Sequence, residues 1–211
     1  MKKQISLLWG LVAFISLFLL SCDNKDAEPT VPTDPYNGHE YVDLGLPSGL
    51  KWATCNVGAS QPHGYGNYYA WGETTTKASY TEGNSLTYGR DLGDISGNVN
   101  YDAARANWGS NWRMPTKAEM EELRDNCTWT WITQGNVNGM RVTGPNGNSI
   151  FLPAAGYRFG SEVYTVQFRG DFWSATDDNS LRALGLFFGS SGEDVSGSGR
   201  YDGQSVRLVQ G

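Results

Sequence analysis

The sequence predicts a domain of the α+β class, with few short helices and many short antiparallel strands. Its 211 residues include 27 Gly, 8 Trp and 11 Tyr, a composition that favours frequent turns with large rings packed between them. Short apolar runs recur between Gly, Asn and Asp turns from residue 40 onwards, and each is long enough for one strand. Helical signals are rarer, which is typical of strand-rich α+β domains.

Apolar alternation and turn residues place the individual elements. Strands are predicted at 40–44, 50–57, 67–71, 128–131, 137–143, 148–152, 164–168, 172–174, 182–188 and 205–209. The polar stretch 77–100 is predicted to be a long loop over the core. Most tryptophans are expected in the core, because small strand-rich domains pack large rings between their turns.

The clearest helix signal is a capping box. Thr116 can cap a helix, and Glu119, three residues later, completes the box. Apolar residues follow at helical spacing, so one face is expected to be buried; these residues are Met120, Leu123 and Cys127. A shorter helix is predicted at 101–107, where three alanines support it.

The N-terminus has the features of a secretion signal. Lys2 and Lys3 precede an apolar run, 5–20, that is shorter than the roughly 20 residues a membrane-spanning helix needs. Cys22 directly follows Leu-Leu-Ser, a pattern that resembles a bacterial lipobox. The resemblance implies cleavage before Cys22 and acylation of its sulfur. An ordinary signal peptide with a chance cysteine, or an uncleaved anchor, is the alternative.

These features divide the chain into three parts. Residues 1–21 are the predicted lipoprotein signal peptide, 22–35 an acidic, proline-rich tether, and 36–211 one domain. The acidic residues after Cys22 resemble the surface-export signal of Bacteroidetes lipoproteins. The expected location is therefore the outer membrane, at the cell surface, with the N-terminal lipid as the membrane contact.

Charge and cysteine content limit the partners. The formal net charge is -6 and becomes -8 once Lys2 and Lys3 leave with the signal peptide, which argues against nucleic acid as a partner. In an exported protein, Cys55 and Cys127 would meet an oxidising compartment. A disulfide between them and two buried free thiols are both compatible with the sequence.

The residues of an enzyme are not evident, and no enzymatic activity is predicted. His39 lies at the tether junction and His63 in a turn, where a solvated histidine is the simplest interpretation. Asp177 and Asp178 could contribute to a calcium site with Asn179, since calcium prefers clustered oxygen ligands. An acidic turn is the simpler interpretation, so no catalytic residue, metal or cofactor is predicted.

Six segments together resemble one family. They are EYVDLGLPSG (40–49), WATCNVGA (52–59), WRMPT (112–116), FLPAAGYR (151–158), FWSAT (172–176) and SVRLV (205–209). The combination resembles the Fibrobacter succinogenes major paralogous domain, found in many Bacteroidetes lipoproteins. This resemblance implies a C-type-lectin-like fold, akin to the domain of formylglycine-generating enzymes. Those enzymes use a reactive cysteine pair late in the domain, whereas no cysteine follows Cys127 here, so their activity is not expected.

The C-terminal segment resembles a narrower group, the target proteins of diversity-generating retroelements, in which the last stretch of a lectin-like domain is rewritten. In 184–189, alternate residues are apolar as a buried strand face should be. The residues between them share no chemistry, and Phe187 is expected to be exposed. Chemically unrelated outward residues on a regular scaffold are what diversification would leave. The alternative is that 191–199 is an ordinary Gly/Ser/Asp surface loop.

The resulting hypothesis is a surface-anchored lipoprotein that binds a protein or glycan through its C-terminal face. The candidate contacts are Asp177, Asp178, Arg182, Gly185, Phe187, Gly189, Glu193, Asp194, Ser196, Ser198 and Asp202. Substituting Phe187 or Arg182 by Ala is expected to weaken binding without unfolding the domain. The alternative function is a structural subunit of a surface fibre or of a polysaccharide-handling complex.

Overall fold

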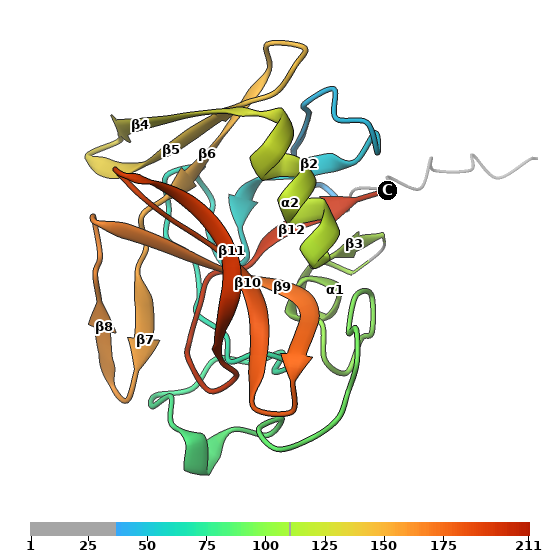
Figure 1. Ribbon diagram of the computed structural model, residues 1–211, viewed down its shortest axis with the longest axis vertical. Coiled ribbons are helices and arrows are strands. Elements are labelled where there is room, and N and C mark those ends of the chain that lie inside the picture. The colour runs from blue at the N-terminus through green and yellow to red at the C-terminus, as the bar shows by residue number, and fades with distance from the viewer. Residues whose placement is uncertain (1–36, 110) are drawn as a thin grey trace, which may run out of the picture. The chain divides into compact units, whose positions relative to one another are not determined.

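The computed structural model describes residues 37–109 and 111–211. In this part of the chain, the strands form several small antiparallel sheets accompanied by two short α-helices (Figure 1). The structure is therefore mostly β, which confirms the prediction of few short helices and many short antiparallel strands. The predicted signal peptide, Cys22 and the tether lie outside the described residues.

One four-stranded sheet has its C-terminal strand in the interior. Its order is β1 (Tyr41–Asp43), β2 (Lys51–Asn56), β12 (Arg207–Gln210) and β3 (Trp112–Arg113). Strands predicted at 40–44, 50–57 and 205–209 correspond to β1, β2 and β12. The last strand along the chain thus pairs with β2 on one side and β3 on the other.

Arg207 fixes this central strand by its buried guanidinium. Its Nε donates to Asn56 Oδ1 at 2.9 Å, and its terminal nitrogens donate to the carbonyl oxygens of Ala53, Thr54 and Phe151, each at 3.0 Å. Burial lowers the pKa of Arg207 to about 9, so the group stays charged at neutral pH. One side chain therefore ties β12 to β2 and to β6 (Ser149–Pro153).

A second sheet is formed by β9 (Arg169–Asn179), β10 (Arg182–Gly189) and β11 (Gly192–Gly199). Residues paired across neighbouring strands share a face, so the register gives this sheet two distinct sides. The side that we call the helix face is apolar and joins a core cluster with α2 (Lys117–Asn126); it carries Phe172, Leu186, Phe188 and Val195. The opposite side is more polar and is described below.

The strand β11 contradicts the alternative interpretation that 191–199 is an ordinary surface loop. All eight of its residues pair with β10, although the segment contains mostly Gly, Ser and acidic residues. Its only apolar residue, Val195, pairs with Leu186 and packs on the helix face. Pairing with β10 supplies the order that the local sequence does not indicate.

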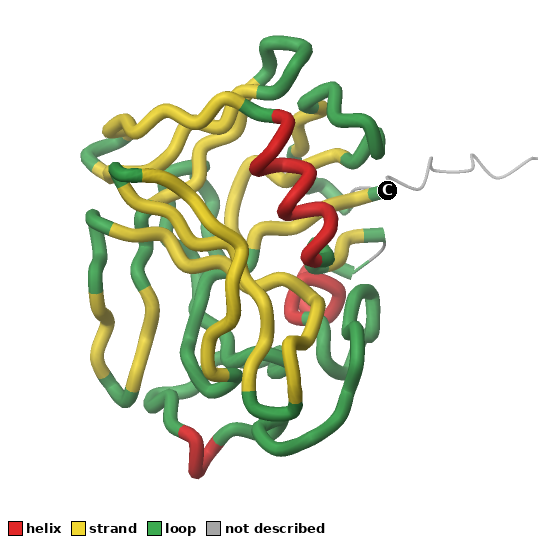
Figure 2. Tube along the Cα trace, in the orientation of Figure 1, coloured by secondary structure: helices red, strands yellow, loops and turns green. Residues whose placement is uncertain are grey.

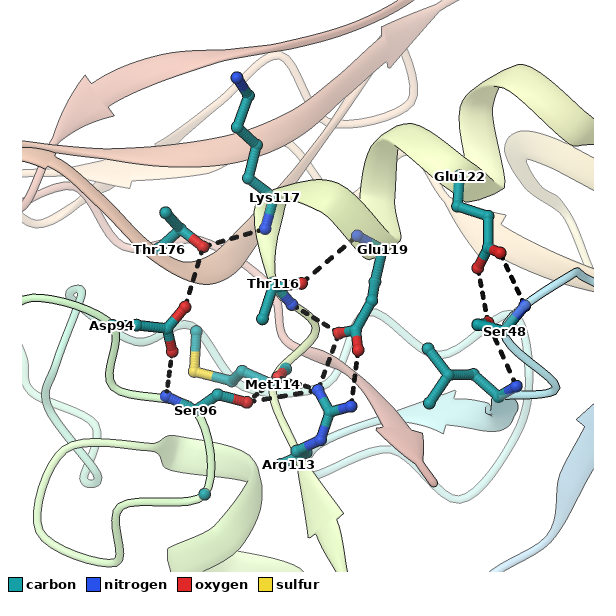
Figure 3. A network of polar contacts seen from close by, with 12 residues as sticks. Ser48, Asp94, Ser96, Arg113, Met114, Thr116, Lys117, Glu119, Glu122 and Thr176 are labelled. Atoms are coloured by element: carbon teal, nitrogen blue, oxygen red, sulfur yellow. Dashed lines mark hydrogen bonds and ion pairs between the residues drawn. The ribbon is translucent and has the colours of Figure 1, made fainter.

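The helix α2 begins at the predicted capping box. Thr116 Oγ1 accepts from Glu119 N at 3.3 Å, and Glu119 accepts from Thr116 N at 2.8 Å. Figure 3 shows how the same carboxylate also receives two hydrogen bonds from Arg113, at 2.6 and 2.7 Å. Thr176 of β9 accepts from Lys117 N at 3.0 Å. The network fixes the start of α2 to the second sheet.

Met120 and Leu123 of α2 are fully buried, as predicted, and Cys127 at its end is half-buried. The shorter helix, α1 (Ala103–Trp108), lies close to its predicted range and is capped by Asp102, whose Oδ1 accepts from Ala104 N at 2.8 Å and from Arg105 N at 3.1 Å. Both helices therefore begin at a side-chain cap, which satisfies otherwise unpaired amide groups.

Two further antiparallel units complete the strands. One contains β4 (Thr128–Gln134), β5 (Val137–Thr143) and β6, close to the predicted ranges. The other is a hairpin of β7 (Tyr157–Phe159) and β8 (Glu162–Tyr164). Figure 1 shows this hairpin at the lower left, beside the second sheet.

Two strand predictions are wrong. The segment 164–168 is a tight turn in which Thr165 and Gln167 have positive φ angles of 57° and 71°, and such angles are incompatible with a strand. The segment 67–71 is extended but makes one isolated bridge, between Tyr69 and Gln204. Its aromatic side chains fill the core instead of extending a ladder.

The predicted loop at 77–100 is confirmed. Figure 2 shows it as loop with one short helical turn, η1 (Glu82–Asn84). Tyr80 anchors this loop, because it is fully buried and its hydroxyl donates to Tyr68 O at 2.5 Å. The prediction that most tryptophans are core residues is also confirmed; the fully buried ones are Trp52, Trp71, Trp112 and Trp173.

Cys55 and Cys127 are both free thiols. They pack against different core clusters, so of the two alternatives the structure has free cysteines and no disulfide. Burial raises the pKa of Cys127 to about 11. Among the described residues, the model contains no helix with the length and apolar character to cross a membrane.

Replacing Arg207 tests the buried guanidinium. Arg207→Met retains much of the side-chain volume but leaves three carbonyl oxygens and Asn56 Oδ1 without this donor. The expected loss of unfolding free energy is about 3 kcal/mol or more, because each buried unsatisfied group costs about 1–3 kcal/mol. Urea denaturation measures it, with exposed Arg141→Met of β5 as the matched control. Equal losses in both variants would contradict the assignment.

Candidate ligand-binding site

The side of the second sheet opposite the helix face carries a concave site. The register places Arg169, Asp171 and Phe187 together on this side, with Asp194 and Ser196 beside them on β11. A cavity of about 360 Å³ opens here, which we call the bowl; it is lined by Tyr157, Phe159, Arg169, Asp171, Ser198 and Asp202. Its walls therefore come from β7, β9, β11 and the chain that follows β11.

Strand β10 lies between the wall of the bowl that carries Asp171 and the wall that carries Asp202, and its residue at this place is Gly185. Gly185 pairs with Ser196 on one side and Trp173 on the other. A Cβ at this position would lie 2.7 Å from Phe172 O, and 3.3 Å from both Gln204 Oε1 and the Phe187 ring. Only glycine leaves space for these groups, so the carboxamide of Gln204 approaches the strand backbone beside the bowl.

Buried polar atoms without partners are concentrated around this site. Of the seven such side-chain atoms found in the described part of the chain, five belong to Arg158, Asp171, Gln204 and Ser205. These residues neighbour one another through backbone hydrogen bonds, from Arg158 N to Gly203 O at 2.7 Å and from Ser205 N to Asp171 O at 3.0 Å. Buried polar groups are normally paired, so such a concentration is typical of a functional site.

Among these residues with unpaired buried atoms, Asp171 has the most strongly altered pKa. Its side chain is 2 % exposed, and Oδ1 pairs with Arg169 at 2.8 Å, whereas Oδ2 has no partner. Burial raises the pKa of Asp171 to about 6, and nearby Asp202 adds to the rise, although the Arg169 guanidinium lowers it. Burial also raises the pKa of Asp202, whose Oδ2 accepts from Ser198 at 2.7 Å.

The rim of the bowl is rigid and aromatic. Arg169 extends over the rings of Tyr157 and Phe187, with its guanidinium carbon 6.0 and 4.9 Å from their centroids. Phe168, next to it, is 76 % exposed. The turn at 164–168 that presents Phe168 is tied down, since Gln167 N donates to Ala154 O at 2.8 Å and Asn138 N donates to Gln167 Oε1 at 2.7 Å.

A second, shallower hollow adjoins the bowl. It has a volume of about 640 Å³ and is lined by Phe168, Arg169 and residues 187–194. Arg169 lines both hollows, so they form one continuous surface at the start of β9. A held, exposed aromatic ring beside an arginine is a common anchor for binding partners.

The predicted contact residues divide into two groups. Ser198 and Asp202 line the bowl, and the second hollow contains Phe187, Gly189, Glu193 and Asp194. Gly185 and Ser196 lie between them on the same side. The remaining three predicted residues, Asp177, Asp178 and Arg182, lie towards the opposite end of the sheet, near the β9–β10 turn.

The prediction of an exposed Phe187 is wrong. The alternation is confirmed for Leu186 and Phe188, which join the core while Phe187 points to the opposite side, but Leu184 is only half-buried and belongs to neither core cluster. However, Phe187 is only 8 % exposed, since Arg169 covers its ring. Gly185 is buried as well. Phe187→Ala would therefore leave a cavity in the sheet and is not a clean test of ligand contact.

The acidic residues expected in a turn at 177–179 form the end of strand β9 instead, and arginines hold them there. Asp177 Oδ2 lies 3.4 Å from Arg200, and Asp178 Oδ2 lies 3.7 Å from Arg182. Asn179 Oδ1 accepts from two backbone amides of the turn. No group of three His, Cys, Asp or Glu side chains able to hold a metal occurs within residues 37–109 and 111–211.

The two histidines lie away from the bowl. His39 stacks on Trp108 with ring centroids 3.5 Å apart, which is a packing role. His63 lies in a turn beside Gly135. Neither is among the residues that line the bowl.

Sequence reasoning misses several residues of the bowl and its neighbour Gln204. The predicted contacts do not include Arg169, Asp171 or Gln204, and no predicted strand contains Tyr157 and Phe159. One local signal was available: Arg169 and Asp171 are charged residues directly before the apolar Phe172-Trp173 pair. Gln204 has no such signal, because its neighbours come from distant parts of the chain.

Comparisons with known proteins do not assign this chain to a family. No family model matches the chain, and no curated protein or solved structure matches it. The site is therefore interpreted from its own geometry.

Asp171 is expected to reduce stability at neutral pH. Its pKa is near 3.8 in the unfolded chain and about 6 in the fold, so the folded state holds the proton more tightly between these values. Raising the pH through this window therefore lowers the unfolding free energy, by at most on the order of 3 kcal/mol. Asp171→Asn removes the charge, so the variant should melt higher than the wild type at pH 7.5 and differ less at pH 5.

Calorimetric melts at both pH values measure this difference. Asp194→Asn, an exposed carboxylate on the same side of the sheet, is the control and should leave the melting temperature unchanged. A lower melting temperature for Asp171→Asn at pH 7.5 would show that Asp171 serves chiefly as the counter-ion of Arg169.

Proposed function

We propose that this protein is a binding protein whose single domain recognises an extracellular protein or glycan through the bowl and the adjoining hollow. One observation carries the proposal: buried polar atoms without partners gather beneath a concave surface with a held aromatic and arginine rim. Stable folds rarely leave such groups unpaired for structural reasons. A ligand that supplies the missing hydrogen bonds explains their presence.

The wider setting belongs to the same proposal. The lipobox-like Cys22, the tether and the family resemblance support a lipid-anchored protein at the cell surface with a C-type-lectin-like domain. In this setting the bowl would face the surroundings of the cell. The mixed chemistry of the surface around β10 and β11 also suits a face that is altered by a diversity-generating retroelement. No catalytic activity is proposed, and the carboxylates, Ser198 and Arg169 of the bowl are interpreted as binding groups.

Two exposed rim residues provide the test. Phe168→Ala and Arg169→Ala should each weaken binding of the full chain by about tenfold or more, because rim-held aromatic and arginine side chains often dominate interface energy. The probes are an array of neutral, acidic and amino-sugar oligosaccharides and a panel of extracellular glycoproteins, before and after enzymatic deglycosylation. Leu86→Ala, which is 69 % exposed in the long loop, is the matched control and should bind as the wild type does.

The outcomes separate the hypotheses. Wild-type protein that binds none of the probes would overturn the proposed function. Binding that is lost in Arg182→Ala but kept in Arg169→Ala would move the site to the β9–β10 turn. A chain that sediments as a regular oligomer and binds no probe would favour the structural-subunit alternative.

A further inference from the structure

We propose that the bowl holds one neutral sugar residue, whose hydroxyl groups pair with Asp171, Gln204 and Arg169. This inference rests on the proposed binding function and specifies its ligand class. It begins from the atoms that the fold leaves without partners, namely Asp171 Oδ2 and both side-chain polar atoms of Gln204. Asp171 and Gln204 are each only 1 % exposed.

Donors and acceptors lie close together here, with Asp171 and Arg169 lining the bowl and the carboxamide of Gln204 beside it at Gly185. Asp171 Oδ2 accepts, Gln204 presents an acceptor oxygen and a donor nitrogen, and Arg169 donates. A hydroxyl group both donates and accepts, so neighbouring sugar hydroxyls can satisfy all of these atoms. An ammonium group only donates and would leave the Arg169 and Gln204 donors unmatched. The pattern therefore favours a polyhydroxy ligand over a lysine side chain or an amine.

The charges that line the bowl favour a neutral sugar over an acidic one. Two carboxylates and one guanidinium line the bowl, and the guanidinium already pairs with Asp171. The second carboxylate, Asp202, is bonded to Ser198 and has no arginine partner among the ion pairs of the described residues. An acidic sugar would meet this uncompensated negative charge at short range, so a neutral sugar is favoured.

The walls suit the apolar side of a sugar ring. Phe159 is 48 % exposed and lines the bowl. It is braced by Tyr201, whose ring centroid lies 6.1 Å away at a tilt of 57°. The opening of about 360 Å³ is at the small end of the roughly 300–1,000 Å³ typical for small-ligand sites. This size suits one ring, with the rest of a glycan lying over the second hollow.

Two variants separate ligand contact from structural support. Gln204→Leu keeps a branched side chain that is one bond shorter and removes two unpartnered buried polar atoms, so it should fold with an unchanged or higher melting temperature. Asp171→Asn should likewise fold. Each is expected to weaken sugar binding by about tenfold or more, because the sugar hydroxyls lose a buried partner. Gln61→Leu, at an exposed glutamine, is the matched control and should bind normally.

Saturation-transfer NMR on the full chain provides the measurement. The probes are the methyl glycosides of glucose, galactose and mannose, with glucuronic acid as the acidic probe and Nα-acetyl-lysine amide as the ammonium probe. The expected result is transfer to at least one neutral glycoside, weaker transfer to glucuronic acid, and none to the lysine derivative. Loss of transfer in Gln204→Leu and Asp171→Asn, at a melting temperature that is not lower than that of the wild type, would support the assignment.

Three results would overturn it. Transfer to the lysine derivative but to no glycoside would identify an amine site. Transfer to a glycoside that is unaffected by both variants would place the sugar elsewhere on the protein. No transfer to any glycoside, together with Phe168-dependent binding of deglycosylated glycoproteins, would refute the sugar site while leaving the proposed binding function intact.

Discussion

The guanidinium of Arg207 is buried where the C-terminal strand meets β2 and β6, and four hydrogen bonds hold it there. Its acceptors are three carbonyl oxygens and one carboxamide oxygen, with no carboxylate among them. A buried charge held in this way is stable only while every acceptor stays in place. The positions of β2, β6 and β12 are therefore mutually dependent. The segment just before Arg207 bonds to Asp171 and Tyr69, so the base of the bowl depends on the same arrangement.

Three arginines show the difference between a side chain that stabilises the fold and one that belongs to the candidate site. Arg207 is satisfied by the backbone and by Asn56. Arg200 is fully buried, donates to the carbonyl oxygens of Thr87, Arg90 and Asn179, and lies 4.2 Å over the Trp71 ring. Arg169, in contrast, has a side chain that is 45 % exposed and a partner, Asp171, that keeps one oxygen unpaired. Proteins commonly accept lower stability at functional sites, and the pair at the bowl has this character.

The sequence predicts most of the fold where the signal is local. Thr116 and Glu119 define the start of α2, and the alternating residues at 137–143 define β5, because capping and alternation act over a few neighbouring positions. β11 escapes prediction because its Gly, Ser and acidic residues acquire strand structure by pairing with β10. The turn at 164–168 escapes it as well, since a β-branched Thr165 gives no warning of a positive φ.

The candidate site is harder to predict than the fold, because its residues are brought together by contacts between distant parts of the chain. Alternation correctly places Leu186 and Phe188 on the core side, but the exposure of Phe187 depends on what covers the other side of the sheet. Arg169, eighteen residues earlier in the chain, covers Phe187. Gln204 reaches its place only when the chain after β11 returns beside β9 and Tyr69. When residues come together only through long-range pairing, no local sequence pattern predicts that they will be neighbours.

The interior position of β12 also determines when the protein can fold. The sheet of β1, β2, β12 and β3 cannot close until residues 207–210 have emerged, so β2 must wait for the end of the domain to be synthesised before it gains its inner neighbour. Pairing between segments so distant in the chain is slow to form. During that delay the growing chain remains incompletely folded, with β2 lacking its inner neighbour.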